Sequence, residues 1–106
     1  MVIVIIDLRV NDVVKVLPVL RELRKAAMFQ PRYISGTTLV GAEDRSLISI
    51  ETIWEGIKDW KEWEKSQTQI DLFRKLLPFL LEKSKIKIYR YLSYEAKAHL
   101  TDSKEV

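Results

Sequence analysis

Residues 54–66 hold all three tryptophans of the chain and join strand-like sequence to helix-like sequence. The segment reads Trp-Glu-Gly-Ile-Lys-Asp-Trp-Lys-Glu-Trp-Glu-Lys-Ser. Trp60 and Trp63 are three positions apart, so on a helix they share one face. An enclosed indole buries about 200 Å² of surface. The segment is therefore predicted either to anchor the packing of a helix on a sheet or to wall a cavity.

Four stretches are predicted strands, because β-branched and aromatic residues dominate them or alternate along them. They are residues 2–10, 33–40, 47–54 and 85–91. In the first stretch, every even position from Val2 to Val10 is aliphatic, whereas Asp7 and Arg9 occupy odd positions. Successive side chains of a strand point to opposite faces. This strand is therefore predicted to have one dry face and one mixed face.

The first helical region follows Asn11 and Asp12, either of which can cap it. Its helically spaced apolar positions are Leu17, Leu20, Leu23 and Ala27, and its outer positions are Arg21, Glu22, Arg24 and Lys25. Pro18 lacks the amide donor that a helix interior needs. We therefore expect the helix to begin near Pro18 or to be kinked there in its first turn.

The second helical region begins in the tryptophan segment and restarts at Ser66, which forms a capping pattern with Gln69. Its predicted apolar stripe consists of Ile70, Phe73, Leu77 and Leu80. Pro78 is expected to kink or shorten its last turns.

The predicted order is βαββαβ, an α+β ferredoxin-like unit with a four-stranded antiparallel sheet and helices on one face. The other face would then present Ile3, Ile5, Ile53 and Tyr89 to water. An apolar patch of this size calls for a cover. A second copy of the chain, packed sheet to sheet, is the simplest one, so we predict a homodimer through the sheet face.

The composition is that of one soluble globular domain, with 47% hydrophobic and 31% charged residues among 106. We place the domain at 1–92 and a polar tail, which carries His99, at 93–106. The absence of cysteine excludes disulfides and thiolate metal sites and is compatible with a reducing compartment. The apolar opening of the chain is too short for a membrane span or a signal peptide. We therefore expect a cytoplasmic protein with no membrane partner.

The net charge of +3 is too small to predict a nucleic-acid partner. Basic and tyrosine residues do gather in the last predicted strand, and an RNA-recognition module has the same element order. That module needs stacking aromatics in a central strand, but residues 47–52 have none and include Glu51. Lysines that guard an edge strand explain the charges.

Four stretches, 20–24, 30–39, 54–66 and 87–89, follow one known pattern. They read Leu-Arg-Glu-Leu-Arg, Gln-Pro-Arg-Tyr-Ile-Ser-Gly-Thr-Thr-Leu, the spaced tryptophans and Lys-Ile-Tyr. They resemble the antibiotic biosynthesis monooxygenase (ABM) domain family, whose members are dimeric α/β barrels. The resemblance covers residues 1–92, which is the predicted domain. Arg32 departs from it, because the family usually has Gly in a Pro-Gly-Tyr turn, so the backbone geometry at this residue is a point to test.

The family includes two chemistries with different requirements. Haem-degrading members resemble this chain at Trp63 but use a histidine ten residues further on as the iron ligand, and here that position is Phe73. Their first-strand Asn falls at or near Asp7. Haem degradation is therefore not expected. The other branch oxidises phenolic or polycyclic aromatic substrates to quinones with O₂ and no bound cofactor, and this is the function that the resemblance favours.

Such an oxygenase needs a dry aromatic pocket, a group that accepts or steers a phenol proton and a donor for the developing oxyanion. The candidate catalytic residues are Asp7, Arg9 and Trp63. The candidate pocket residues are Tyr33, Ser35, Glu51, Trp60 and Phe73. No metal site and no bound cofactor are expected.

Each candidate also has an interpretation without chemistry. The tryptophans can be core residues, and Asp7 and Arg9 can form an ion pair at a strand end or in a dimer seam. Glu51 can pair with a Lys or Arg of a second copy. Tyrosines commonly pack across strands. The competing function is therefore a non-catalytic ligand-binding or regulatory homodimer of the same fold.

Overall fold

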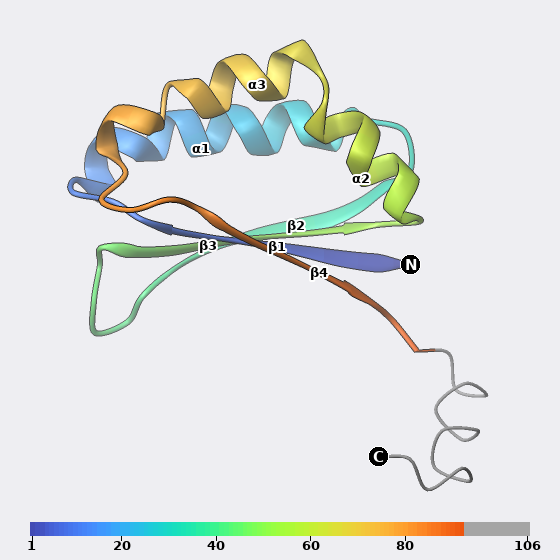
Figure 1. The fold of residues 1–106 in the computed structure, drawn as a ribbon, viewed down its shortest axis with the longest axis horizontal. Coiled ribbons are helices and arrows are strands. Elements are labelled where there is room, and N and C mark those ends of the chain that lie inside the picture. The colour runs from blue at the N-terminus through green and yellow to red at the C-terminus, as the bar shows by residue number, and fades with distance from the viewer. Residues whose placement is uncertain (93–106) are drawn as a thin grey trace, which may run out of the picture.

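The computed structural model describes residues 1–92, and the predicted tail with His99 lies outside them. The elements are β1 (Val2–Arg9), α1 (Val13–Met28), β2 (Tyr33–Val40), β3 (Leu47–Trp54), α2 (Ile57–Glu64), α3 (Gln67–Arg74), a 3₁₀ turn (Leu77–Phe79) and β4 (Lys85–Arg90). The sheet is antiparallel with strand order β2-β3-β1-β4, and the helices lie on one side of it (Figure 1). The predicted ferredoxin-like α+β fold is confirmed.

The first strand alternates between the two faces of the sheet as predicted. From Val2 to Leu8 the even positions are buried against the helices, and the odd positions are only half-buried. The register carries this alternation to both neighbouring strands, because Ile3 lies opposite Ile53 on β3 and opposite Tyr89 on β4. We call the side of the sheet that carries Ile3, Ile53 and Tyr89 the bare face. It is an apolar surface that nothing in residues 1–92 covers.

Helix α1 begins at Val13, because Asp12 caps it. The Asp12 carboxylate accepts hydrogen bonds from the backbone N–H groups of Val14, at 3.1 Å, and Lys15, at 3.2 Å. Pro18 therefore lies in the second turn, and the alternative in which the helix begins near it is wrong. Its side chain is exposed on the outer surface of the helix. Proline cannot donate the helical hydrogen bond at this position, and the missing bond lies on the solvent side of the helix rather than in the core.

The cap at Ser66 is confirmed, since its hydroxyl accepts a hydrogen bond of 3.2 Å from the Gln69 amide and α3 follows directly. The predicted apolar stripe beyond it is correct only in part, because Phe73 and Leu80 pack against the core whereas Ile70 and Leu77 are exposed. The buried residues are Leu72, which is 9% exposed, and Leu76, which is fully buried, whereas Leu77 is 55% exposed. Helix α3 ends at Arg74 and a 3₁₀ turn containing Pro78 follows, so the 3.6-residue period on which the stripe was based does not continue.

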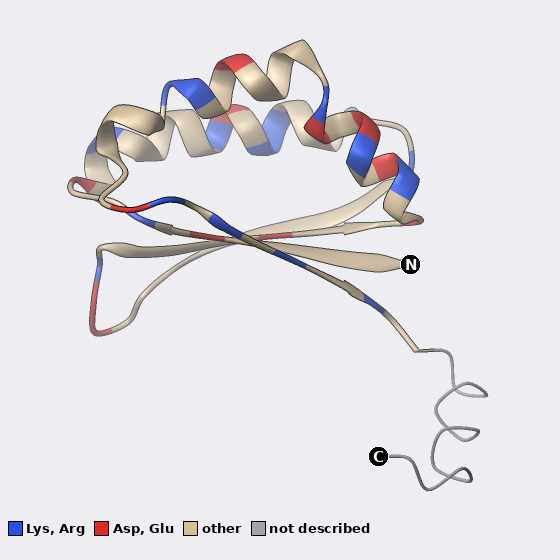
Figure 2. Ribbon diagram, viewed as in Figure 1, with Lys and Arg blue, Asp and Glu red and all other residues tan. Residues whose placement is uncertain are grey.

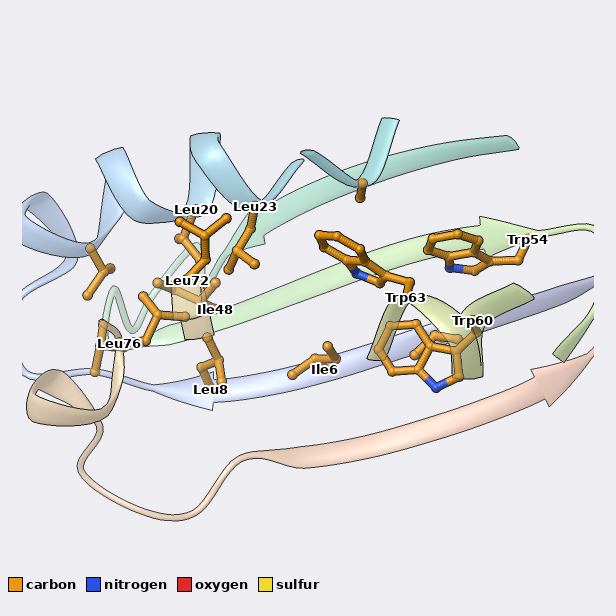
Figure 3. Close-up of a cluster of buried hydrophobic side chains, with 14 of the residues drawn as sticks. Ile6, Leu8, Leu20, Leu23, Ile48, Trp54, Trp60, Trp63, Leu72 and Leu76 are labelled. Carbon is orange, nitrogen blue, oxygen red and sulfur yellow. The ribbon is translucent and has the colours of Figure 1, made fainter. Parts of the chain in front are cut away.

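The core lies between the helices and the covered face of the sheet, as Figure 3 shows. Aliphatic side chains from α1, α3, β1 and β3 fill one end of it, and the three indoles gather at the other. Trp54, Trp60 and Trp63 are 0%, 1% and 4% exposed. The tryptophan segment therefore anchors the helices on the sheet, as its sequence predicts.

Arg32, which departs from the family pattern, keeps the backbone conformation that glycine would favour. Its φ of 61° lies in the left-handed region, which costs a residue with a Cβ about 1–2 kcal/mol. Its guanidinium lies 3.3 Å from an Asp59 carboxylate oxygen and 3.8 Å from one of Glu55. Its carbonyl accepts a backbone hydrogen bond of 3.0 Å from Glu55. The turn geometry therefore survives the substitution, and ion pairs hold the side chain.

Candidate functional site

A small cavity of about 30 Å³ lies between the covered face of the sheet and the helices. Its surface is mostly apolar. Its lining residues are Ile6, Leu20, Leu23, Arg24, Ala27, Gly36, Thr37, Thr38, Ile50, Glu51, Thr52, Trp60, Trp63, Gln69 and Phe73. Three of the predicted site residues, Trp60, Trp63 and Phe73, therefore meet at one place, and Glu51 reaches it from the sheet.

The aromatic wall of this cavity comes from two consecutive helices. Trp60 and Trp63 lie on α2, and Phe73 lies near the end of α3. Trp54, on β3, does not line the cavity, and its Nε1 donates a hydrogen bond of 3.0 Å to the Thr52 hydroxyl. The Trp60 Nε1, by contrast, is buried and has no hydrogen-bond partner within residues 1–92. A buried indole N–H usually finds an acceptor, so the Trp60 ring carries an unused donor.

Gly36 lets the hydroxyl of Tyr33 lie beside the cavity. A Cβ built on Gly36 would collide with the Tyr33 hydroxyl and would lie 3.3 Å from the carbonyl oxygen of Glu51. The Tyr33 ring packs edge-on against Trp54, with ring centroids 5.4 Å apart. The sequence signals this arrangement, because a glycine inside a predicted strand indicates a bulge or a close backbone approach. The strand pairing is indeed irregular between Tyr33 and Ser35.

Arg24 sits at the polar rim of the cavity, next to Tyr33. Burial raises the pKa of the Tyr33 phenol above its ordinary value of 10.0, and the charge of Arg24 and a hydrogen bond with it oppose part of that rise. The phenol is therefore protonated at neutral pH and can act as a donor. Sequence reasoning missed Arg24 because it places this arginine among the solvated outer positions of α1.

Asp7 and Arg9 lie on the bare face, away from this cavity. The expectation that they supply its polar contacts does not hold within one chain, because β1 turns its even positions toward the helices. They line a separate groove of about 470 Å³ on the bare face, together with Glu82 and Lys85. Their catalytic role stays a prediction, and any such role belongs to this second surface.

Arg9 is paired within the chain, although not with Asp7. Its guanidinium lies 3.2 Å from Asp44 and 3.3 Å from Glu82. Hydrogen bonds from Ser46, followed by Arg9, lower the pKa of the Asp44 carboxyl. Arg9 thus ties the β2–β3 turn to the chain after the 3₁₀ turn. Asp7 lies opposite Lys85 in the register of β1 and β4.

Ser35 and Glu51 also belong to the bare face. Ser35 lies opposite Ile53, and Glu51 lies opposite Ile5, whose other neighbour is Lys87. Because facing residues of paired strands share a side of the sheet, the Glu51 side chain points away from the cavity, and Glu51 lines the cavity through its backbone. Figure 2 shows Lys and Arg positions spaced along β4, at the edge of the sheet. The bare face therefore combines apolar rows with both signs of charge.

Two other site classes can be assessed over residues 1–92. No three His, Cys, Asp or Glu side chains in this part of the chain come close enough to hold a metal ion. None of the helices described combines the length and the apolar character that a membrane crossing requires.

No family model and no curated protein matches this sequence. Solved structures match it closely in fold. An antibiotic biosynthesis monooxygenase crystal structure superposes with a TM-score of 0.81 at 15% identity, over 88% of this chain and 100% of that one. A conserved protein from Methanosarcina mazei Go1 gives a TM-score of 0.81 at 16% identity, over 86% of this chain and 92% of the other. SnoaB, a cofactor-independent oxygenase from Streptomyces nogalater, gives 0.79 at 11% identity, over 87% and 93%. The chain therefore has an ABM-like fold.

Proposed function

We propose that this protein is a cofactor-independent monooxygenase that acts on a small aromatic or quinol-like substrate. The observation that carries the proposal is the apolar cavity walled by Trp60, Trp63 and Phe73 inside an ABM-like fold. One structural neighbour with this fold is described as a cofactor-independent oxygenase. Aromatic walls exclude water and stack on a planar substrate, which favours chemistry in which the substrate itself supplies the electrons.

The reaction that fits such a pocket starts from a substrate anion. Loss of a proton to water from a phenol or an activated CH₂ group leaves a stabilised phenolate or carbanion, which transfers electrons to O₂. One oxygen atom becomes the new carbonyl oxygen and the other leaves as water, so that R₂CH₂ + O₂ gives R₂C=O + H₂O. The carbon is oxidised, and O₂ is the only oxidant needed. The protein has to orient the ring and stabilise the oxyanion.

The residues near the cavity divide between walls and donors. Trp63 and Phe73 are the walls that hold the ring. The protonated Tyr33 hydroxyl, held beside the cavity next to Arg24, is the neutral donor available for an oxyanion. In this arrangement Asp7 and Arg9 lie on the bare face and do not contact the substrate ring in the cavity.

We further propose that two copies of the chain associate through the bare face. That face presents apolar rows around Ile3 and Ile53, next to an acid, Glu51, and a base, Lys87. A two-fold axis brings the same surface of each copy together, so a face that carries both signs of charge complements itself. Glu51 then pairs with a Lys or Arg of the second copy.

One observation favours the second candidate, a non-catalytic ligand-binding or regulatory homodimer. The cavity holds only about 30 Å³, whereas an engineered cavity known to bind benzene holds about 150 Å³. An aromatic substrate therefore has to displace lining side chains, and Phe73, half-buried near the end of α3, is the wall with most freedom to move. A protein whose cavity never opens would keep the fold without the chemistry.

The test is a tryptophan-fluorescence titration of the full chain with naphthols, anthrones, hydroquinones and haem, followed by oxygen uptake with any compound that binds. Saturable quenching by an aromatic compound, weakened in Trp63→Phe and retained in the control Trp54→Phe, is expected, together with oxygen consumption. Binding without oxygen uptake favours the regulatory dimer. A Soret band on addition of haem, or no saturable response to any aromatic compound, overturns the proposal.

A further inference from the structure

A second depression adjoins the aromatic cavity along the seam between α1 and β2. It has a volume of about 250 Å³ and an apolar floor that includes Leu17 and Ile48. It shares Leu20, Arg24 and Thr38 with the cavity, so the two are the wide and the narrow ends of one groove. An engineered cavity of roughly 150 Å³ binds benzene, so the wide end, which is open to solvent, has room for an aromatic ring. An aromatic molecule can therefore lie in it before any wall of the cavity moves.

Two arginines, Arg21 and Arg24, line the wide end of this groove. They are three positions apart on α1, so they lie on one side of the helix. Neither forms an ion pair with any acid among residues 1–92, whereas Arg9, Arg32 and Arg74 each do. A guanidinium without an acidic partner above an apolar floor suits a ligand that is apolar along its body and carries an anion at one end.

A neutral donor lies next to Arg24, although Tyr33 itself is not among the residues that line the groove. The Tyr33 hydroxyl lies beside Arg24, and Gly36 leaves the space that it occupies. A guanidinium and a phenol O–H together match the two oxygens of one planar carboxylate. A neutral quinol needs only one such donor.

We propose that the groove binds an aromatic acid, a one- or two-ring arene with a carboxylate, whose carboxylate contacts Arg24 and Arg21 and whose ring lies on the apolar floor of the wide end. The inference rests on the proposed function, which assigns the reaction to the aromatic ring of the ligand. It narrows the proposed substrate class from aromatic molecules in general to aromatic molecules that carry an anion. Arg21 and Arg24 are binding residues in this arrangement.

Isothermal titration of the full chain with 2-naphthoate and with its neutral near-isostere 2-naphthamide tests the charge requirement. Because hydrogen bonds to charged groups are the strong ones, 2-naphthoate is expected to bind about tenfold or more tightly than the amide at low salt. Its advantage shrinks as salt is added. Equal affinities for the acid and the amide overturn the inference.

Substitutions of the arginines test which side chain contacts the carboxylate of the ligand. Arg24→Gln is expected to abolish the preference for the acid, Arg24→Lys to keep part of it, and Arg21→Gln to weaken it less. The matched control is Lys25→Gln, because Lys25 is an exposed cation of the same helix that lines neither end of this groove. A loss in Lys25→Gln equal to that in Arg24→Gln shows a diffuse charge effect and contradicts the proposed site.

The same titrations separate this inference from the proposed function. If the chain binds aromatic acids more tightly than their amides but consumes no oxygen with any of them, the groove assignment is supported and the oxygenase proposal is contradicted. Oxygen uptake with neutral quinols, and no preference for acids, supports the oxygenase and overturns the groove assignment.

Discussion

The two faces of the sheet are formed by the same strands but differ in burial and in the residues they present. On β1, Val4 is fully buried under the helices, while its neighbours Ile3 and Ile5 are half-buried on the bare face. The covered face encloses an aromatic cavity, and the bare face carries Asp7, Arg9 and an open groove. Candidate residues that are adjacent in sequence can therefore belong to separate sites, because a strand alternates its side chains.

The two faces are also expected to contribute to different properties: the covered face to the stability of the folded chain, and the bare face to the association of two chains. The covered face supplies the core and therefore most of the free energy of folding. The bare face leaves apolar side chains only partly covered, and in the proposed dimer a second copy of the chain covers them. The substitutions that follow test this division, beginning with the one that is expected to have the largest effect.

Trp60→Ala should cost about 3–5 kcal/mol in free energy of unfolding, because it removes a buried indole from the covered face and leaves a cavity. Urea denaturation monitored by circular dichroism measures the loss. The control is Leu77→Ala, since Leu77 is 55% exposed and its truncation should cost under about 1 kcal/mol. Equal losses in the two variants would contradict the assignment of the core to this face.

Ile53→Glu on the bare face should leave the chain folded and convert the proposed dimer to monomer. An unpaired carboxylate buried in an interface costs several kcal/mol, so the dimer dissociation constant should rise about hundredfold or more. Light scattering coupled to gel filtration measures the mass, and circular dichroism checks the fold. Val14→Glu, at an α1 position that is 65% exposed, should change neither. A wild-type chain that is already monomeric at micromolar concentration would refute the dimer.

Gly36→Ala should destabilise the chain by about 1–3 kcal/mol, because the new Cβ displaces the Tyr33 hydroxyl. Tyr33→Phe removes that hydroxyl, so the double variant should lose about 1 kcal/mol less than the sum of the two single losses. Thr37→Ala, one residue along β2 and exposed, is the control and should cost little. Strictly additive losses would show that Gly36 and Tyr33 do not share this space.

The smallest expected effect is on the pH dependence of stability. The folded pKa of Tyr33 is raised above 10.0, so folding favours the protonated phenol. The stability that this contributes is fully present below pH 10 and is lost as the pH rises through the folded pKa. Urea unfolding between pH 8 and 11 should therefore show a steeper loss in the wild-type chain than in Tyr33→Phe. Parallel profiles would contradict the burial of this phenol.

Local patterns predicted most of the fold. The strands at 33–40 and 47–54 have the bounds that alternation and turn residues predict, and the cap at Ser66 is a short-range hydrogen bond that three residues specify. The stripe beyond it was predicted correctly at Phe73 and Leu80 and wrongly at Leu77, because a periodic pattern assumes a continuous helix and this one ends at Arg74. Leu72 and Leu76 are buried instead, and because they are four positions apart they lie on the same side of the chain.

By itself, the sequence determined the strands, the two faces of β1 and the shared helical face of Trp60 and Trp63, because these depend on neighbours within a few residues. Only the tertiary structure decided which candidates share a site. It set Asp7 and Arg9 apart from Trp63 because the helices cover the opposite side of the sheet. It also brought Arg24 beside Tyr33, although the helical pattern places this arginine in solvent. Contacts between distant segments depend on how α1 lies across β2, and that arrangement is set by the packing of the whole core.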